Sequence, residues 1–217
     1  MDVQTLDHVA LWVADRDAIA EVATSRLGMH VIERTEAFTL VGADAKLGKL
    51  TLFAAEAPRE RGALKHVGLR VGELPGGADE VDLAEDLRIR LVEAPTDVEY
   101  DLDHVALFST DPERTAESYL ELGFEPAEPG GGGVPRVQAG GKFVEFHRGE
   151  VEATERPLLN HLAVLVDSAE AQRAEAEDAG LEIADFVDAP NTLALFVWGP
   201  DRVKIEYVEH KPSFSLV

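Results

Sequence analysis

Four of the seven histidines stand at the same place in a repeated sequence pattern. Each repeat reads Leu, a polar residue, His and then an apolar run, and the four copies are Leu6-Asp7-His8, Leu64-Lys65-His66, Leu102-Asp103-His104 and Leu159-Asn160-His161. Short apolar runs of this kind predict strands. Imidazole serves both as a metal ligand and as an acid–base group. Four histidines at equivalent strand positions therefore indicate a polar centre built on strands.

Two carboxylates lie inside apolar strand patterns near the ends of the third and fourth repeats. They are Glu145 in Lys142-Phe143-Val144-Glu145-Phe146 and Glu206 in Lys204-Ile205-Glu206-Tyr207-Val208. Burial disfavours a charged carboxylate unless something compensates. A divalent cation would do so, and imidazole with carboxylate suits Fe, Mn, Ni, Co or Zn. If the last two units face each other, His104, Glu145, His161 and Glu206 are predicted to bind one divalent metal ion.

The first two repeats lack carboxylates at the aligned positions. When the last strands of the four repeats are aligned in sequence, Leu52 occupies the position of Glu145, and Arg90 occupies the position of Glu206. We therefore interpret His8 and His66 as relics of duplication that are satisfied by hydrogen bonds.

His147 lies two residues after Glu145, so both side chains are expected on one face of a strand. One interpretation makes His147 an acid or base beside the metal. The other makes it a strand-end residue that reaches solvent.

Helix signals follow three of the repeated strands. Asp15, Asp111-Pro112 and Asp167-Ser168 can begin helices that end at Leu27-Gly28, Leu122-Gly123 and Ala179-Gly180. The distances from His to Gly are 20, 19 and 19 residues, so the three units are in register. Alternating strands separated by turn residues follow, which predicts a βαβββ unit.

The second unit departs from the pattern. Only 38 residues separate His66 from His104, against 58 and 57 in the other intervals, and we expect at most a short helix over 79–87. The chain is thus expected to be an α+β protein of four modules, the second one trimmed. We predict an N-terminal module pair over residues 1–97, and a C-terminal pair with the metal site over residues 98–217.

The composition limits the partners. The chain of 217 residues carries 42 Asp and Glu against 20 Lys and Arg, a net charge of −22. This charge argues against nucleic acid and anionic membranes, and indicates either an ordinary acidic protein or one adapted to high salt. There is no cysteine, no membrane-length apolar run and no signal-peptide pattern. We expect a halophilic cytoplasmic protein with a small-molecule substrate. A homodimer is one assembly that the sequence allows.

Strand-opening histidines, Leu-Gly after the helices, and Gly199-Pro200-Asp201 before the Lys204-Ile205-Glu206 strand together resemble the vicinal-oxygen-chelate superfamily. The resemblance spans about residues 6–209. It implies modules paired into two open β-barrel halves around one divalent metal, which binds two oxygens of a small substrate. The superfamily includes glyoxalases, extradiol dioxygenases and metal-free binding proteins.

Two activities compete within that resemblance. Glyoxalases fill four ligand positions, which here match His104, Glu145, His161 and Glu206. Extradiol dioxygenases have four modules in one chain and three ligands, which here match His104, His161 and Glu206. The dioxygenase pattern also implies a Tyr where this chain has Phe196, and a His near Asp188 or Ala189. We therefore expect glyoxalase-like lyase or isomerase chemistry, with Glu206, Glu145 and His147 as the catalytic groups. Ring cleavage and metal-free binding are the alternatives.

Overall fold

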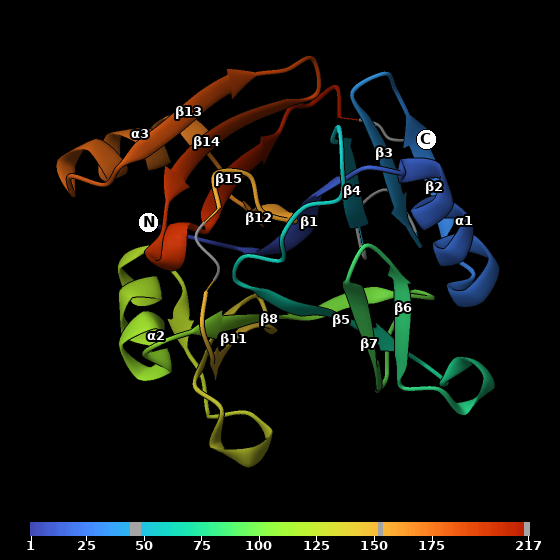
Figure 1. Ribbon diagram of the computed structural model, residues 1–217. Coiled ribbons are helices and arrows are strands. Elements are labelled where there is room, and N and C mark those ends of the chain that lie inside the picture. Colours follow the sequence, from blue (N-terminus) through green and yellow to red (C-terminus); the bar gives the residue numbers. More distant parts are fainter. Residues whose placement is uncertain (44–48, 152–153, 215–217) are drawn as a thin grey trace.

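The computed structural model describes residues 1–43, 49–151 and 154–214. In this part of the chain it contains two β-sheets and three α-helices, a mixed α+β architecture (Figure 1). The α-helices are α1 (Arg16–Leu27), α2 (Pro112–Glu121) and α3 (Ala169–Asp178). Short 3-10 turns are η1 (Pro75–Gly77), η2 (Gly131–Gly133) and η3 (Pro200–Arg202).

Each sheet combines strands from two modules. The eight-stranded sheet has the order β13-β14-β15-β12-β1-β4-β3-β2. Its strands are β1 (Thr5–Val13), β2 (His30–Arg34), β3 (Phe38–Gly42), β4 (Lys49–Ala54), β12 (Leu159–Leu165), β13 (Ile183–Asp188), β14 (Thr192–Trp198) and β15 (Lys204–His210). The seven-stranded sheet has the order β6-β7-β5-β8-β11-β10-β9. Its strands are β5 (Leu64–Val71), β6 (Glu80–Ala84), β7 (Leu87–Glu93), β8 (Asp101–Ser109), β9 (Glu125–Pro126), β10 (Arg136–Ala139) and β11 (Lys142–Arg148).

The three predicted helices are confirmed, and their caps have the expected chemistry. The side chains of Asp15, Asp111 and Ser168 accept hydrogen bonds from backbone N–H groups in the first turns of α1, α2 and α3. These bonds satisfy donors that a helix leaves unpaired at its start. Gly28 ends α1 at a φ of 73°, a left-handed conformation that glycine adopts readily.

No helix forms over 79–87, where the sequence predicted at most a short one. Residues Glu80–Ala84 form strand β6, which pairs antiparallel with β7. Leu83 is buried while its neighbours Asp82 and Ala84 are exposed, the alternation of a strand with one covered face. A tight turn at Ala84, Glu85 and Asp86, all with positive φ, joins β6 to β7. The trimmed module does keep its first and last strands, β5 and β7.

The modules pair in an order that differs from the expected one. The first strand of module one, β1, is antiparallel to the first strand of module four, β12. In the other sheet β5 of module two is antiparallel to β8 of module three. Figure 1 shows the same arrangement, with the two ends of the chain sharing the upper sheet and the middle of the chain forming the lower one. The division between the sheets therefore does not coincide with residue 97, since each expected half contributes one module to each sheet.

Helix α2 ties the two sheets together through the faces that bear no histidine. Tyr119 on α2 packs against Phe146 of β11, with ring centroids 4.8 Å apart. At the end of the same helix, the hydroxyl of Tyr207 on β15 donates a hydrogen bond of 2.8 Å to the carbonyl of Leu122. All three aromatic side chains are buried. The apolar core thus lies between the sheets and their helices. The histidine-bearing face of each sheet does not take part in this packing. None of the helices among the described residues is long and apolar enough to cross a membrane.

Gly68 on β5 provides a test of the pairing between modules two and three. A Cβ atom at this position would lie 2.2 Å from Cε1 of His104, so no larger residue fits beside the buried ring. We expect Gly68→Ala to lower the free energy of unfolding by about 1–3 kcal/mol through overpacking. Urea unfolding followed by circular dichroism measures this.

Gly72→Ala is the matched control, since no atom in the described part of the chain lies within 4 Å of the place its Cβ would take. It should change stability by no more than about 1 kcal/mol. Equal effects of the two substitutions would contradict the close approach of His104 to β5.

Candidate metal centre

The pairing of modules places four histidines in two separate pairs. His8 of β1 lies beside His161 of β12, with their Nε2 atoms 3.3 Å apart. His66 of β5 lies beside His104 of β8, with their Nε2 atoms 2.9 Å apart. Each pair occupies the middle of its sheet, because the strands that carry it are the central ones.

Parallel pairing adds one flanking residue to each side of each histidine pair. Two residues after each histidine, the first strand pairs with the last strand of its own module, in the registers Ala10↔Thr51, Gly68↔Arg90, Ala106↔Glu145 and Ala163↔Glu206. Thr51, not Leu52, is thus the equivalent of Glu145, which corrects the sequence alignment by one residue. The equivalence of Arg90 with Glu206 is confirmed. A one-residue change of register exchanges the two faces of a strand, so Leu52 points into the apolar core.

The predicted four-ligand centre is therefore corrected. His161 and Glu206 lie together in the eight-stranded sheet, whereas His104 and Glu145 lie in the seven-stranded sheet. The physical reason is that modules three and four each form their central antiparallel pair with a different partner module. We call the set His8, His161, Glu206 and Thr51 the first centre, and the set His66, His104, Arg90 and Glu145 the second centre.

The first centre gathers three metal-ligating side chains. Oε2 of Glu206 lies 2.9 Å from Nε2 of His161 and 3.2 Å from Nε2 of His8. Together these are the one group of at least three His, Asp or Glu side chains among the described residues whose ligand atoms come close enough to share an ion. His8, interpreted from the sequence as a relic, supplies the third ligand. The Leu–polar–His motif in the sequence marks His8 as a candidate. The sequence alone did not place His8 beside His161, because it predicts that module one pairs with module two and not with module four.

The buried carboxylate shows that these residues fit a metal ion. Glu206 is 7% exposed, and its Oε2 atom receives no well-directed hydrogen bond from the described residues, despite the two imidazoles beside it. The three ligand atoms lie within 4.8 Å of one another, close enough to share one ion. Two imidazoles and a carboxylate, with further positions open, form a donor set typical of catalytic metal sites.

A β-bulge orients each of these histidines. The polar residue that precedes each histidine in the motif is skipped in the antiparallel register, at Asp7, Lys65, Asp103 and Asn160. In three of the four modules the extra residue turns its side chain to the histidine that follows: the Nδ1 atoms lie 2.8 Å from Asp7, 2.8 Å from Asp103 and 3.3 Å from Asn160. A partner on Nδ1 fixes the ring orientation and leaves Nε2 for the ligand. The motif therefore encodes both a ligand and its support.

The charges of the first centre balance one another. Burial alone would lower the pKa of His8, but the carboxylates of Asp7 and Glu206 raise it to about 9. Burial alone would raise the pKa of Glu206, but His161 and His8 hold it far below its ordinary range. Burial lowers the pKa of His161. In the absence of a metal, a protonated His8 between two carboxylates therefore compensates the buried charge, and a metal ion would replace that proton.

Aromatic side chains surround the first centre. The ring of His161 lies 5.2 Å from Phe196 and 6.2 Å from Phe53, centroid to centroid. Trp12 packs against Phe53 at 5.5 Å. Thr51, 8% exposed, lies on β4 two residues before Phe53 and so on the same face. The centre is thus a polar group of atoms inside an aromatic wall, with a hydroxyl on the side opposite Glu206.

The second centre does not gather ligands in this way. Glu145 is turned toward His147 and Arg136, at 3.5 Å and 3.6 Å. His147 lies on the same face as Glu145, as expected, and its Nδ1 atom is 2.9 Å from Nζ of Lys65. Burial and the neighbouring Lys65 lower the pKa of His147. His147 and Glu145 are therefore neighbours, but both lie in a different sheet from Glu206.

Comparison with solved structures places this fold among known ones. The chain superposes on a Bacillus subtilis protein provisionally named a dioxygenase with a TM-score of 0.76 and 14% identity, covering 97% of this chain and 86% of that one. It superposes on glyoxalase I from Zea mays with a TM-score of 0.73 and 15% identity, covering 94% and 92%. It also matches the cppA protein of Streptococcus pneumoniae, with a TM-score of 0.59 and 14% identity over 96% and 98%. No protein-family model and no curated protein matches the sequence.

Asp7 provides a test of the bulge-supported ligand. Removing the carboxylate frees the ring of His8, so we expect Asp7→Ala to weaken metal binding by about 10–100-fold. Competition with a fluorescent chelator measures the affinity. Asp103→Ala, the equivalent change at the bulge of the other sheet, is the control and should leave the affinity unchanged. Similar losses in both variants would show a general effect on folding.

His66 provides a test of pH dependence. Burial, then the neighbouring His104, Lys65 and Arg90, lower its pKa from 6.5 to about 3. Between these values the unfolded chain binds a proton that the folded chain does not, so this group makes stability fall as the pH drops below about 6.5. We expect His66→Gln to reduce this acid sensitivity in urea unfolding at a series of pH values. His30→Gln, at an exposed position, should retain the sensitivity of the parent, and an unchanged slope for His66→Gln would contradict the assignment.

In this chain the modules pair through their first strands. Its fold is the one found in glyoxalase I from Zea mays and in the Bacillus subtilis protein.

Proposed function

We propose that this protein is a divalent-metal-dependent enzyme whose centre is formed by His8, His161 and Glu206. The observation that carries the proposal is the convergence of two imidazole nitrogens on a buried carboxylate oxygen that has no well-directed hydrogen bond from the described residues. A bound divalent ion would supply Lewis-acid chemistry and hold two oxygens of a small substrate.

The number of ligands favours oxygen chemistry over isomerisation. Two histidines and one carboxylate with open positions are typical of non-haem Fe(II) oxygenases. A glyoxalase-like mechanism needs a second carboxylate on the flank opposite Glu206, and Thr51 stands there. We therefore propose an Fe(II) dioxygenase, reversing the preference that the sequence alone suggested. The provisional name of the Bacillus subtilis neighbour is consistent with this choice.

Each surrounding residue has a role in this proposal. Asp7 and Asn160 hold His8 and His161 with Nε2 directed inward. Phe53 and Phe196 keep water away from the reacting atoms and offer flat apolar surface to a planar substrate. The hydroxyl of Thr51 can donate a hydrogen bond to a substrate oxygen on the flank opposite Glu206. Phe196 carries no hydroxyl group and cannot donate a proton. A proton needed at this position would have to be supplied by the substrate itself.

Metal analysis of the purified protein tests the proposal. We expect about one divalent ion per chain in the parent and less than about 0.2 in Glu206→Gln, because loss of a ligand removes most of the binding free energy. Glu145→Gln is the matched control, since it removes a carboxylate at the equivalent position in the other sheet and should retain the ion. Loss of metal from Glu145→Gln alone would contradict the first centre and restore the ligand set that the sequence suggested.

Activity separates the two chemistries. After anaerobic loading with Fe(II), a catechol followed by air should produce oxygen uptake in the parent and in Glu145→Gln but not in Glu206→Gln. Turnover of a chelating substrate without oxygen uptake would instead support lyase or isomerase chemistry. A parent protein that binds no metal would support a metal-free binding protein. The charge of the chain makes assay in concentrated KCl advisable, since screening reduces self-repulsion.

A further inference from the structure

The second centre has diverged in charge from the first at equivalent positions. When module two is compared with module four, Arg90 takes the position of Glu206, and Lys65 takes the position of the bulge residue Asn160. The first replacement exchanges a carboxylate for a cation, and the second exchanges a neutral amide for a cation. A site with a cation at a ligand position and another beside its histidine is unsuited to bind a metal cation.

Arg90 is available for a ligand. It is exposed, and among the described residues it forms no hydrogen bond or ion pair, although Glu80 lies opposite it on β6. Glu80 is instead engaged by Arg88, which also contacts Asp82. Within the described part of the chain, the carboxylate opposite Arg90 is thus held by another arginine.

Lys65 lies near Arg90, and near the carboxylates of Glu145 and Glu80. Nζ of Lys65 lies 2.9 Å from Nδ1 of His147 and carries protons that can be shared with an anion. The Nε2 atom of His147 is buried and lies 3.5 Å from Oε2 of Glu145, without a well-directed hydrogen bond within the described part of the chain. His66 is 4% exposed and lies between these cations and His104. The carboxylates nearby are already engaged, Glu145 with Arg136 and His147, and Asp103 with Arg70 through bonds of 2.7 and 2.9 Å.

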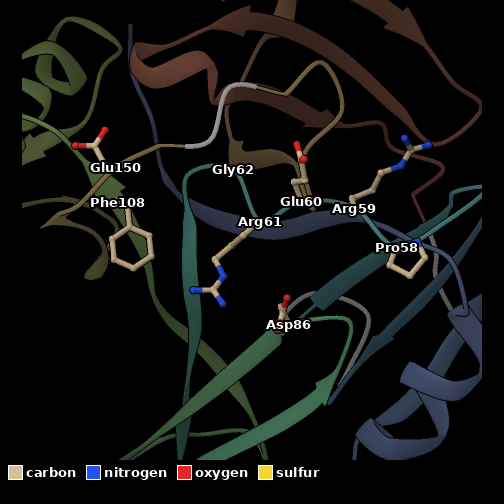
Figure 2. Close-up of a pocket in the computed structure, with 8 residues that line it drawn as sticks. All are labelled: Pro58, Arg59, Glu60, Arg61, Gly62, Asp86, Phe108 and Glu150. Carbon is tan, nitrogen blue, oxygen red and sulfur yellow. The ribbon is translucent and has the colours of Figure 1, made fainter.

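A cavity lies farther along the same face. It has a volume of about 550 Å³ and is lined by Pro58, Arg59, Glu60, Arg61, Gly62, Asp86, Phe108 and Glu150 (Figure 2). Phe108 is on β8, an even number of residues after His104, so both side chains lie on one face. Figure 2 shows the Arg61 side chain extending between Phe108 and Asp86. The Nε atom of Arg59 is buried without a hydrogen-bond partner among the described residues. The cavity has room for the organic part of a ligand, and a flat ring to contact it.

We propose that the second centre binds an oxyanion, a carboxylate or a phosphate, through Arg90 and Lys65. The planar guanidinium of Arg90 matches two oxygens of such a group, and Lys65 adds a point charge. This site is separate from the first centre, so its failure would leave the proposed metal enzyme untouched.

Calorimetric titration of the full chain tests this site. The chain, treated with a chelator, is titrated with sodium phosphate and, separately, with sodium benzoate at constant ionic strength. We expect Arg90→Gln and Lys65→Gln each to weaken binding of the preferred anion by about tenfold or more, because hydrogen bonds to charged groups contribute about 1.5–3 kcal/mol. Preference for phosphate or for benzoate identifies which oxyanion the site takes.

Arg88→Gln is the matched control. It lies two residues from Arg90 on the same strand and removes the same charge, but its partners are Glu80 and Asp82. It should change the affinity by less than about twofold, since long-range attraction is screened. Equal losses in Arg88→Gln and Arg90→Gln, or no binding of either anion by the parent, would overturn the proposal. The proposal would also be overturned if the chain bound a second divalent ion that is lost in His104→Ala and retained in Arg90→Gln.

Discussion

The antiparallel pairing of first strands is the constraint on which the rest of this structure depends. Each module brings one histidine near the start of its first strand, and pairing two such strands places two histidines side by side. The last strand of each module then runs parallel to its own first strand and adds a flanking residue. Two modules therefore supply two central and two flanking positions by backbone geometry alone. Which side chains stand there decides what each pair of modules can bind.

The histidines can be presented to a ligand because the backbone is irregular beside them. A bulge places the preceding polar residue next to the ring, so that Asp7 and Asn160 support the two imidazoles of the first centre. The same device with Asp103 supports His104. Lys65 cannot accept a hydrogen bond from His66, and its ammonium group contacts His147 instead. Burial of these polar groups is tolerated because each is compensated by a neighbour of opposite charge or by a hydrogen bond.

The two centres place different side chains at equivalent positions of one repeated framework. In the first, two imidazoles and Glu206 point to one position, and Phe53 and Phe196 stand beside them. In the second, Arg90 and Lys65 make the same positions cationic, and Glu145 is turned to other partners. The helices and the apolar core do not depend on this difference, since Phe146 and Tyr207 lie on the opposite faces of the sheets, where helix α2 contacts both. Function can therefore change on one face without loss of the fold.

The sequence by itself determined the module and the histidine-bearing strand within it. Capping residues such as Asp15 and Ser168 act within one turn of chain, so the helices could be located, and the repeated motif identified strands that carry histidine. Only the tertiary structure decided which modules pair, since the four first strands carry nearly the same pattern and any two could pair in principle. That choice brought His8 to His161 and Glu206, separated Glu145 from Glu206, and put Thr51 in place of Leu52. The physical reason is that strand pairing and register are fixed by contacts between residues distant in sequence, which local patterns do not encode.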